Sequence, residues 1–314
     1  MNGEIATGSE IQTVEQAILK TVAFFDIFIY PLTAWEIFCW SSWPSGADYR
    51  LVLIALEKMI VSGRLERGLS FYYLPGRGEL VAIRQERYTI TAQKFKRALK
   101  AVRLFRWLPW LQGVAMANLI GSHNLRAESD IDLVLITAPK RLWLSRLLIG
   151  GVTQVLGWRP RPGYEQDSIC LSFWLSNDQL DVQSVVMGER DYYFRYWLAG
   201  LTPVYERNHV FYHWRQANQW VYEHFPLRAS RIINFWRRVE PIWPEQQTGL
   251  SSSQTNWFED LAKKIQLRKL ANNLRRIMNQ DTRVVINDQM LKLHSNDRRM
   301  EFNQEYEKRL AQIR

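Results

Sequence analysis

Residues 114–137, VAMANLIGSHNLRAESDIDLVLIT, decide the fold of this chain. An apolar run, VAMANLIG, ends in a Gly-Ser pair, a polar loop follows, and a second apolar run begins at Ile131. Short apolar runs that are bounded by loop residues are typical of buried strands. We therefore predict two consecutive strands, joined by a loop that ends at Asp130.

The same pattern continues on the C-terminal side. A helical segment, RLWLSRLLIGGVTQVLG (141–157), is followed by a third apolar run, ICLSFWLS (169–176). A helix between strands indicates an α/β unit with at least three strands. We predict an α/β (α+β) protein whose core, residues 111–200, contains a small mixed sheet.

The N-terminal residues 1–79 show another pattern. Two helical segments lie within 12–43, a third helix covers YRLVLIALEKMIV (49–61) and stops at Gly63, and RLERGLSFYYLPGR is expected to form two short strands around a turn at Gly68. Three helices and a hairpin in this order are the layout of a winged helix-turn-helix. We predict a winged-helix-like domain over 1–79.

The rest of the chain is predicted to be mainly helical. Residues 80–110 are expected to form one connecting basic helix, and 201–314 a C-terminal helical region that includes basic amphipathic helices. The basic residues of the connecting helix are predicted either to form a solvated face or to face phosphate, and both interpretations stay open. They are Arg84, Arg87, Lys94, Lys96, Arg97, Lys100, Arg103 and Arg106.

Composition limits the class of protein. The 314 residues are 47% apolar, enough for a sizeable core, and 41 Lys and Arg against 31 Asp and Glu give a net charge of +10. Such an excess predicts a polyanionic partner, either nucleotide phosphates, nucleic acid or an acidic surface. Two cysteines exclude a disulfide framework and a cysteine-based zinc site, and we expect a cytoplasmic protein. The apolar stretches are short or interrupted by charges, so we expect no membrane span.

Asp130 and Asp132 are the candidate chemical groups. Residues i and i+2 of a strand project to the same face, so the two carboxylates point the same way. They repel each other, and the pKa of one rises unless a cation lies between them. Mg²⁺ is the natural occupant because it prefers oxygen ligands and leaves positions for water and phosphates. The small pair Gly121-Ser122 allows backbone N–H groups to approach a phosphate closely.

This arrangement of Gly-Ser, a spacer, Asp-x-Asp and an apolar strand resembles the signature of the polymerase-beta-like nucleotidyltransferase superfamily, and SDIDLVLI is similar to its minimal bacterial members. The resemblance implies transfer of a nucleoside monophosphate from an NTP to an acceptor, with magnesium held by three carboxylates. It also implies that Gly121 and Ser122 bind the triphosphate, and that Asp130 and Asp132 are the first two metal ligands.

The resemblance further implies a third carboxylate on a neighbouring strand, facing the first two. Asp167, just before the third apolar run, is the first choice, Asp181 the second and Asp178 the third. The interval between Gly-Ser and Asp-x-Asp is shorter than in many relatives and lacks their second glycine, so we expect Arg126 to supply charge to the triphosphate.

Two functions follow as hypotheses. The first is a magnesium-dependent nucleotidyltransferase whose acceptor is a small molecule, an RNA or a protein. The second is a winged-helix DNA-binding or regulatory protein with an inactive nucleotidyltransferase-like domain, in which basic surfaces bind nucleic acid.

Overall fold

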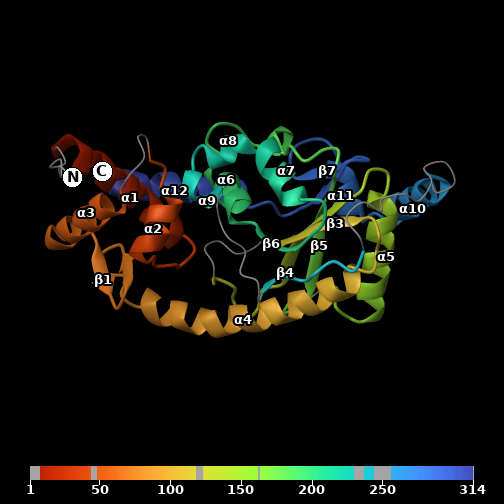
Figure 1. Ribbon diagram of the computed structural model, residues 1–314, viewed down its shortest axis with the longest axis horizontal. Helices are drawn as coiled ribbons and strands as arrows, with labels where there is room; N and C mark the ends of the chain where they lie inside the picture. The colour runs from red at the N-terminus through yellow and green to blue at the C-terminus, as the bar shows by residue number, and fades with distance from the viewer. Residues whose placement is uncertain are drawn as a thin grey trace.

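The computed structural model describes residues 8–43, 48–117, 123–161, 163–229, 237–243 and 256–313 (Figure 1). Over these residues the helices are α1 (Gly8–Asp26), α2 (Ala34–Trp40), α3 (Tyr49–Val61), α4 (Leu80–Phe105), α5 (Leu142–Val155), α6 (Tyr192–Gly200), α7 (Val210–Ala217), α8 (Gln219–Tyr222), α9 (Pro226–Ala229), α10 (Asn256–Arg268), α11 (Asn272–Ile277) and α12 (Arg299–Gln312), with a short 3-10 helix at Gln183–Val185. The strands are β1 (Glu66–Gly68), β2 (Phe71–Tyr73), β3 (Leu111–Met116), β4 (Ile131–Thr137), β5 (Ile169–Ser176), β6 (Thr202–Glu206), β7 (Val284–Ile286) and β8 (Met290–Leu293).

The central sheet is mixed, as predicted. Across the described residues it has six strands in the order β6-β3-β4-β5-β8-β7. β4 and β5 are parallel, and the other neighbouring pairs are antiparallel. The helix α5 connects β4 to β5, which is the crossover that a parallel pair requires. The prediction of a mixed α/β protein with strands at the three apolar runs is therefore confirmed.

Both faces of this sheet are buried. Alternate residues of β4, such as Leu133 and Leu135, pack in one apolar cluster with residues of α4 and α5. Val134 and Ile136 point the other way, into a second cluster that contains residues of α1, α2, α3 and α6. Figure 1 shows α4 running along one side of the molecule, from the N-terminal helices to the far end of the sheet. The N-terminal region and the sheet therefore share one continuous core.

The N-terminal elements begin and end where local chemistry predicts. Thr33 and Glu36 form a reciprocal capping box at the start of α2. After α3, Gly63 adopts a left-handed φ of +71°, as expected for a helix stop. Leu32 forms an isolated bridge with Tyr72 of β2, so the chain before α2 lies beside the hairpin. The predicted order of three helices and a hairpin is confirmed, whereas the assignment as a winged-helix domain stays a prediction.

Gly68 does not form the turn of the β1–β2 hairpin. It is the last residue of β1 and pairs with Phe71, and the turn has Leu69 in a left-handed conformation with φ of +55°. A Cβ at position 68 would lie 2.8 Å from the Tyr73 hydroxyl and 3.2 Å from Val81 Cγ2. Glycine is therefore required by the close approach of α4 and Tyr73.

The C-terminal region over 201–314, predicted to be helical, also contains strands that the sequence did not predict. This segment contributes three of the six strands, β6, β7 and β8. These strands are only three to five residues long, too short for a period of two to stand out beside the aromatic helices around them. The basic amphipathic stretch over 257–278 forms two helices, since α10 ends at Arg268 and α11 begins at Asn272.

Within the described part of the chain, no helix combines the length and the apolar character needed to cross a membrane.

Arg84 offers a direct test of how α4 is attached to the N-terminal helices. Its buried guanidinium donates to Glu36 at 2.7 Å and lies 3.8 Å from the centre of the Tyr30 ring. Arg84→Met should lower the free energy of unfolding by about 3 kcal/mol, because it leaves Glu36 without its charged partner. Arg97→Met, at an exposed position of α4, should change it by less than about 0.5 kcal/mol. Urea unfolding of both variants measures the difference, and equal effects would contradict the structural role of Arg84.

Candidate functional site

The two predicted carboxylates lie together at one edge of the sheet. Asp130 immediately precedes β4 and Asp132 is its second residue. Parallel pairing places Asp132 opposite Cys170, the second residue of β5. The ligand atoms of Asp130, Asp132 and Cys170 all lie within 4.8 Å of one another, and each side chain is partly exposed. We call these three residues the acidic corner.

Burial and the closeness of the two carboxylates shift the pKa values of the acidic corner. Burial, followed by the charge of Asp130, raises the pKa of Asp132 to about 7. The pKa of Asp130 is also raised, first by burial and then by Glu165. Burial and the two carboxylates raise the pKa of the Cys170 thiol, which is therefore protonated at neutral pH. A bound cation would offset both the repulsion between the two carboxylates and the energetic cost of burying their charge.

The donor atoms fit Mg²⁺ through the two carboxylates. Mg²⁺ is commonly bound by one or two carboxylates together with water and substrate phosphates. Asp130 and Asp132 would hold the ion, which would neutralise phosphate charge when bound. A thiol is a soft ligand that suits zinc and similar ions, so Cys170 would add affinity for those ions and none for Mg²⁺.

None of the three candidate third acids belongs to the acidic corner. Asp167 Oδ1 lies 2.7 Å from Lys94 Nζ, in a turn where Asp167 has a φ of +58°. Asp178 and Asp181 follow the C-terminal end of β5, whereas the acidic corner is at its N-terminal end, roughly 20 Å away along the strand. The position that faces Asp132 from the neighbouring strand is that of Cys170.

The loop before Asp130 is attached to α4. Lys94 Nζ donates to the carbonyl oxygens of Ala127 at 3.0 Å and Ser129 at 2.6 Å, and Thr91 Oγ1 accepts from Leu125 N at 3.1 Å. One turn earlier on α4, Arg87 donates to Asn124 Oδ1. Arg87 and Lys94 are thus neither solvated nor facing phosphate. They are positioning residues for the loop that leads to the acidic corner.

Of the three residues predicted to bind phosphate, the structure describes one, Arg126. Gly121 and Ser122 lie outside the described residues. Arg126 is exposed, and no ion pair of its side chain is found in the described part of the chain. The exposed basic residues of α4 include Lys96, Arg97 and Lys100.

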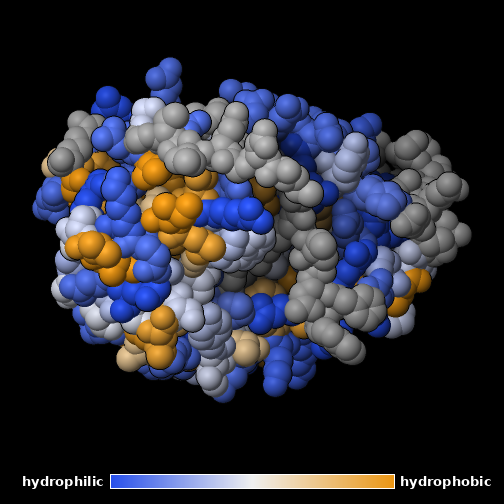
Figure 2. Space-filling view, turned by 60° about the vertical axis from the view of Figure 1, so that its left-hand side comes forward, coloured by the Kyte–Doolittle hydropathy of each residue, from blue (hydrophilic) through white to orange (hydrophobic). Residues whose placement is uncertain are grey.

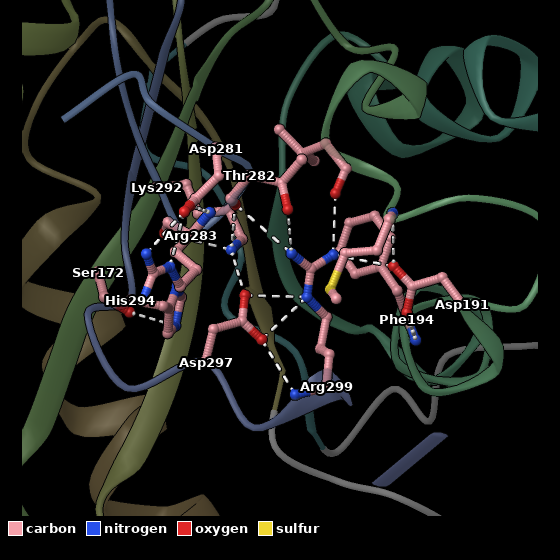
Figure 3. Close-up of polar contacts among 12 residues, drawn as sticks. Ser172, Asp191, Phe194, Asp281, Thr282, Arg283, Lys292, His294, Asp297 and Arg299 are labelled. Carbon is pink, nitrogen blue, oxygen red and sulfur yellow. Dashed lines mark hydrogen bonds and ion pairs between the residues drawn. The ribbon is translucent and has the colours of Figure 1, made fainter. Parts of the chain in front are cut away.

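A hydrogen-bonded chain continues from the acidic corner to β8. Cys170 Sγ donates to Ser172 Oγ at 3.3 Å, and Ser172 Oγ is 2.9 Å from His294 Nε2 (Figure 3). Burial and the nearby Lys292 lower the pKa of His294 to about 4, so its imidazole is neutral at neutral pH. Neither Cys170 nor His294 belongs to a sequence motif, and the pairing of β5 with β8 brings the two residues to the same part of the sheet.

Comparison with protein-family models, with curated proteins and with solved structures found no match. The site is therefore interpreted from its residues and geometry.

Asp132→Asn tests the electrostatics of the acidic corner. The pKa of Asp132 is raised from about 4 in the unfolded chain to about 7, so metal-free wild type loses stability as pH rises from 4 to 7. An asparagine carries no charge and avoids this loss. In EDTA, the variant should melt at the same temperature as wild type near pH 4 and about 3 °C or more above it at pH 8. Asp178→Asn should show no such trend, and a difference that does not change with pH would contradict the account.

Cys170→Ser tests the donor set. The variant should bind Zn²⁺ about tenfold or more weakly and Mg²⁺ as wild type does, because only the soft ion uses the thiol. Cys39→Ser, at the second cysteine of the sequence, should change neither affinity. Isothermal titration calorimetry with each ion measures these affinities. Equal loss of both ions in Cys170→Ser would show that the residue supports the fold of the site instead.

Proposed function

We propose that this protein is a magnesium-dependent nucleotidyltransferase that transfers a nucleoside monophosphate from an NTP to an acceptor. The observation that carries the proposal is the pair Asp130 and Asp132, whose carboxylate oxygens lie within 4.8 Å of each other at the start of a buried strand, where burial raises the pKa of both. A bound Mg²⁺ ion would place positive charge between the two carboxylates, and a metal-bound triphosphate is the substrate of this reaction class.

The proposed chemistry needs positioning and charge more than covalent help from the protein. An acceptor oxygen bonds to the α-phosphorus, the bond from that phosphorus to the bridging oxygen breaks, and pyrophosphate and one proton leave. Asp130 and Asp132 would hold the ion beside the phosphates, and Arg126 would add charge from the loop. Lys94 and Thr91 would keep this loop in place through their bonds to its backbone.

One observation favours binding without transfer as a second candidate. The resemblance implies a third carboxylate opposite the first two, and Cys170 occupies that position. A protonated thiol neither binds Mg²⁺ nor accepts a proton readily. In this second proposal the domain would bind a nucleotide and the N-terminal region would contact a partner.

The N-terminal region gives less support to a duplex DNA partner. The exposed side of α3 includes Leu53, Ile54 and Val61. Two of its three charged residues form ion pairs, Lys58 with Glu15 and Glu57 with Arg67, and the third, Arg50, is exposed. Figure 2, with this side of the molecule turned toward the viewer, shows apolar and hydrophilic patches next to one another. Exposed apolar side chains therefore interrupt the charged residues of α3, which favours a phosphate backbone less than a continuous basic surface would.

Transfer of label decides between the two candidates. The protein is incubated with Mg²⁺, a cell extract and each NTP labelled at the α-phosphate, and the labelled product is separated. Wild type should transfer label, and Asp130→Asn with Asp132→Asn should reduce transfer by about 100-fold or more. Asp178→Asn, an exposed acid at the opposite end of β5, should retain it.

The two negative outcomes differ. Transfer that survives the double substitution would refute the proposed site. Magnesium-dependent NTP binding by wild type with no transfer to any acceptor would favour the binding-only alternative.

A further inference from the structure

A cavity of about 210 Å³ opens beside the acidic corner, and Asp132 lines it. Its other lining residues come from β5 and β8 of the sheet, from α6 and from α12 with the segment just before it. It therefore lies between one face of the sheet and two helices. Because Asp132 belongs to both, a molecule in this cavity can reach an ion held at the acidic corner.

Aromatic rings form much of the cavity wall. Tyr193 of α6 and Phe302 of α12 are stacked, with centroids 4.9 Å apart and planes inclined by 24°. Phe173 of β5 and Trp197 of α6 meet edge to face at 5.6 Å. Flat apolar walls of this kind suit a planar ring, since bases stack readily on aromatic side chains.

Three charged residues of the wall, Lys292, Asp297 and Arg299, form ion pairs with one another. Lys292 Nζ donates to Asp297 at 2.8 Å and to the Thr282 carbonyl oxygen at 2.7 Å. Arg299 donates to the same Asp297 and, at 3.0 Å, to Asp191 (Figure 3). The pairs leave little net charge for an anion in this part of the cavity. An uncharged occupant therefore fits better than a phosphate.

Two polar side chains of the wall remain available. In the described part of the chain, no hydrogen bond is made by the Tyr193 hydroxyl or by the exposed Asn296 amide. Arg298, half-exposed, lies 5.0 Å from the centre of the Phe302 ring. The cavity thus combines stacking surfaces with neutral donors and acceptors, the combination that recognises a base by its face and its edge.

The volume of the cavity favours a nucleotide base over a large acceptor. Sites for drug-sized ligands are about 300–1,000 Å³, so a cavity of about 210 Å³ holds one ring system. An RNA end or another large acceptor would have to remain outside it. We infer that the cavity binds the base of the NTP whose phosphates bind at the acidic corner, an inference that rests on the proposed nucleotidyltransferase function.

The experiment measures the two halves of the nucleotide separately. Free nucleosides, which lack phosphates, probe the cavity by saturation-transfer NMR in EDTA. Tripolyphosphate with Mg²⁺, which lacks a base, probes the acidic corner by calorimetry. At least one of the four common nucleosides should bind wild type, and tripolyphosphate should bind only with Mg²⁺.

Two variants alter the cavity in different ways. Phe302→Leu removes a stacking surface, and Asn296→Trp, at an exposed position, fills the entrance. Each should weaken nucleoside binding by about tenfold or more and leave tripolyphosphate binding unchanged. Asp130 does not line the cavity, so Asp130→Asn should weaken tripolyphosphate binding and leave nucleoside binding unchanged. Tyr212→Leu, at an exposed aromatic residue outside the cavity, should change neither.

The failures are distinguishable. If no nucleoside binds, or if binding is the same in both cavity variants, the base site is refuted whatever tripolyphosphate does. If nucleosides bind as expected and tripolyphosphate does not bind, the cavity accepts a base and the proposed phosphate site is refuted.

Discussion

The parallel pairing of β4 with β5 is the constraint on which the site depends. Parallel strands start at the same edge of a sheet, so Asp132 and Cys170 lie opposite each other at the N-terminal ends of their strands. The crossover helix α5 makes this pairing possible. It packs on the face of the sheet that contains Leu133 and Leu135 of β4. An antiparallel arrangement of the two strands would place the start of β5 at the far edge, and the acidic corner would not form.

A second constraint comes from α4. This helix spans the molecule and carries, in successive turns, Arg84 for the N-terminal helices and Arg87, Thr91 and Lys94 for the loop before β4. Its basic residues therefore divide into a buried set that holds backbone in place and an exposed set that contributes to the net charge. The positive charge of the chain is consequently less available to a polyanion than the composition indicates.

The sequence predicted the elements with strong local signals and missed those set by tertiary contacts. The strand at Ile131, the long helix after Leu80 and the stop at Gly63 follow from apolar runs, periodicity and a glycine cap. The nearness of Asp130 and Asp132 follows from the alternation of side chains along a strand. The position of Cys170 opposite Asp132 cannot be predicted in this way. It depends on the register between two strands that are separated by a helix, and no local pattern encodes that register. The strand β6 was missed for a related reason, since it is defined by pairing with β3.

We propose that Asp130 and Asp132 bind the metal of a metal-bound triphosphate. A crystal structure with Mn²⁺ and a non-hydrolysable NTP analogue, with anomalous scattering to locate the ion, is the decisive experiment. We expect an anomalous peak bonded to carboxylate oxygens of both residues and to phosphate oxygens of the analogue. A peak elsewhere, or an analogue bound without contact to either carboxylate, would contradict it.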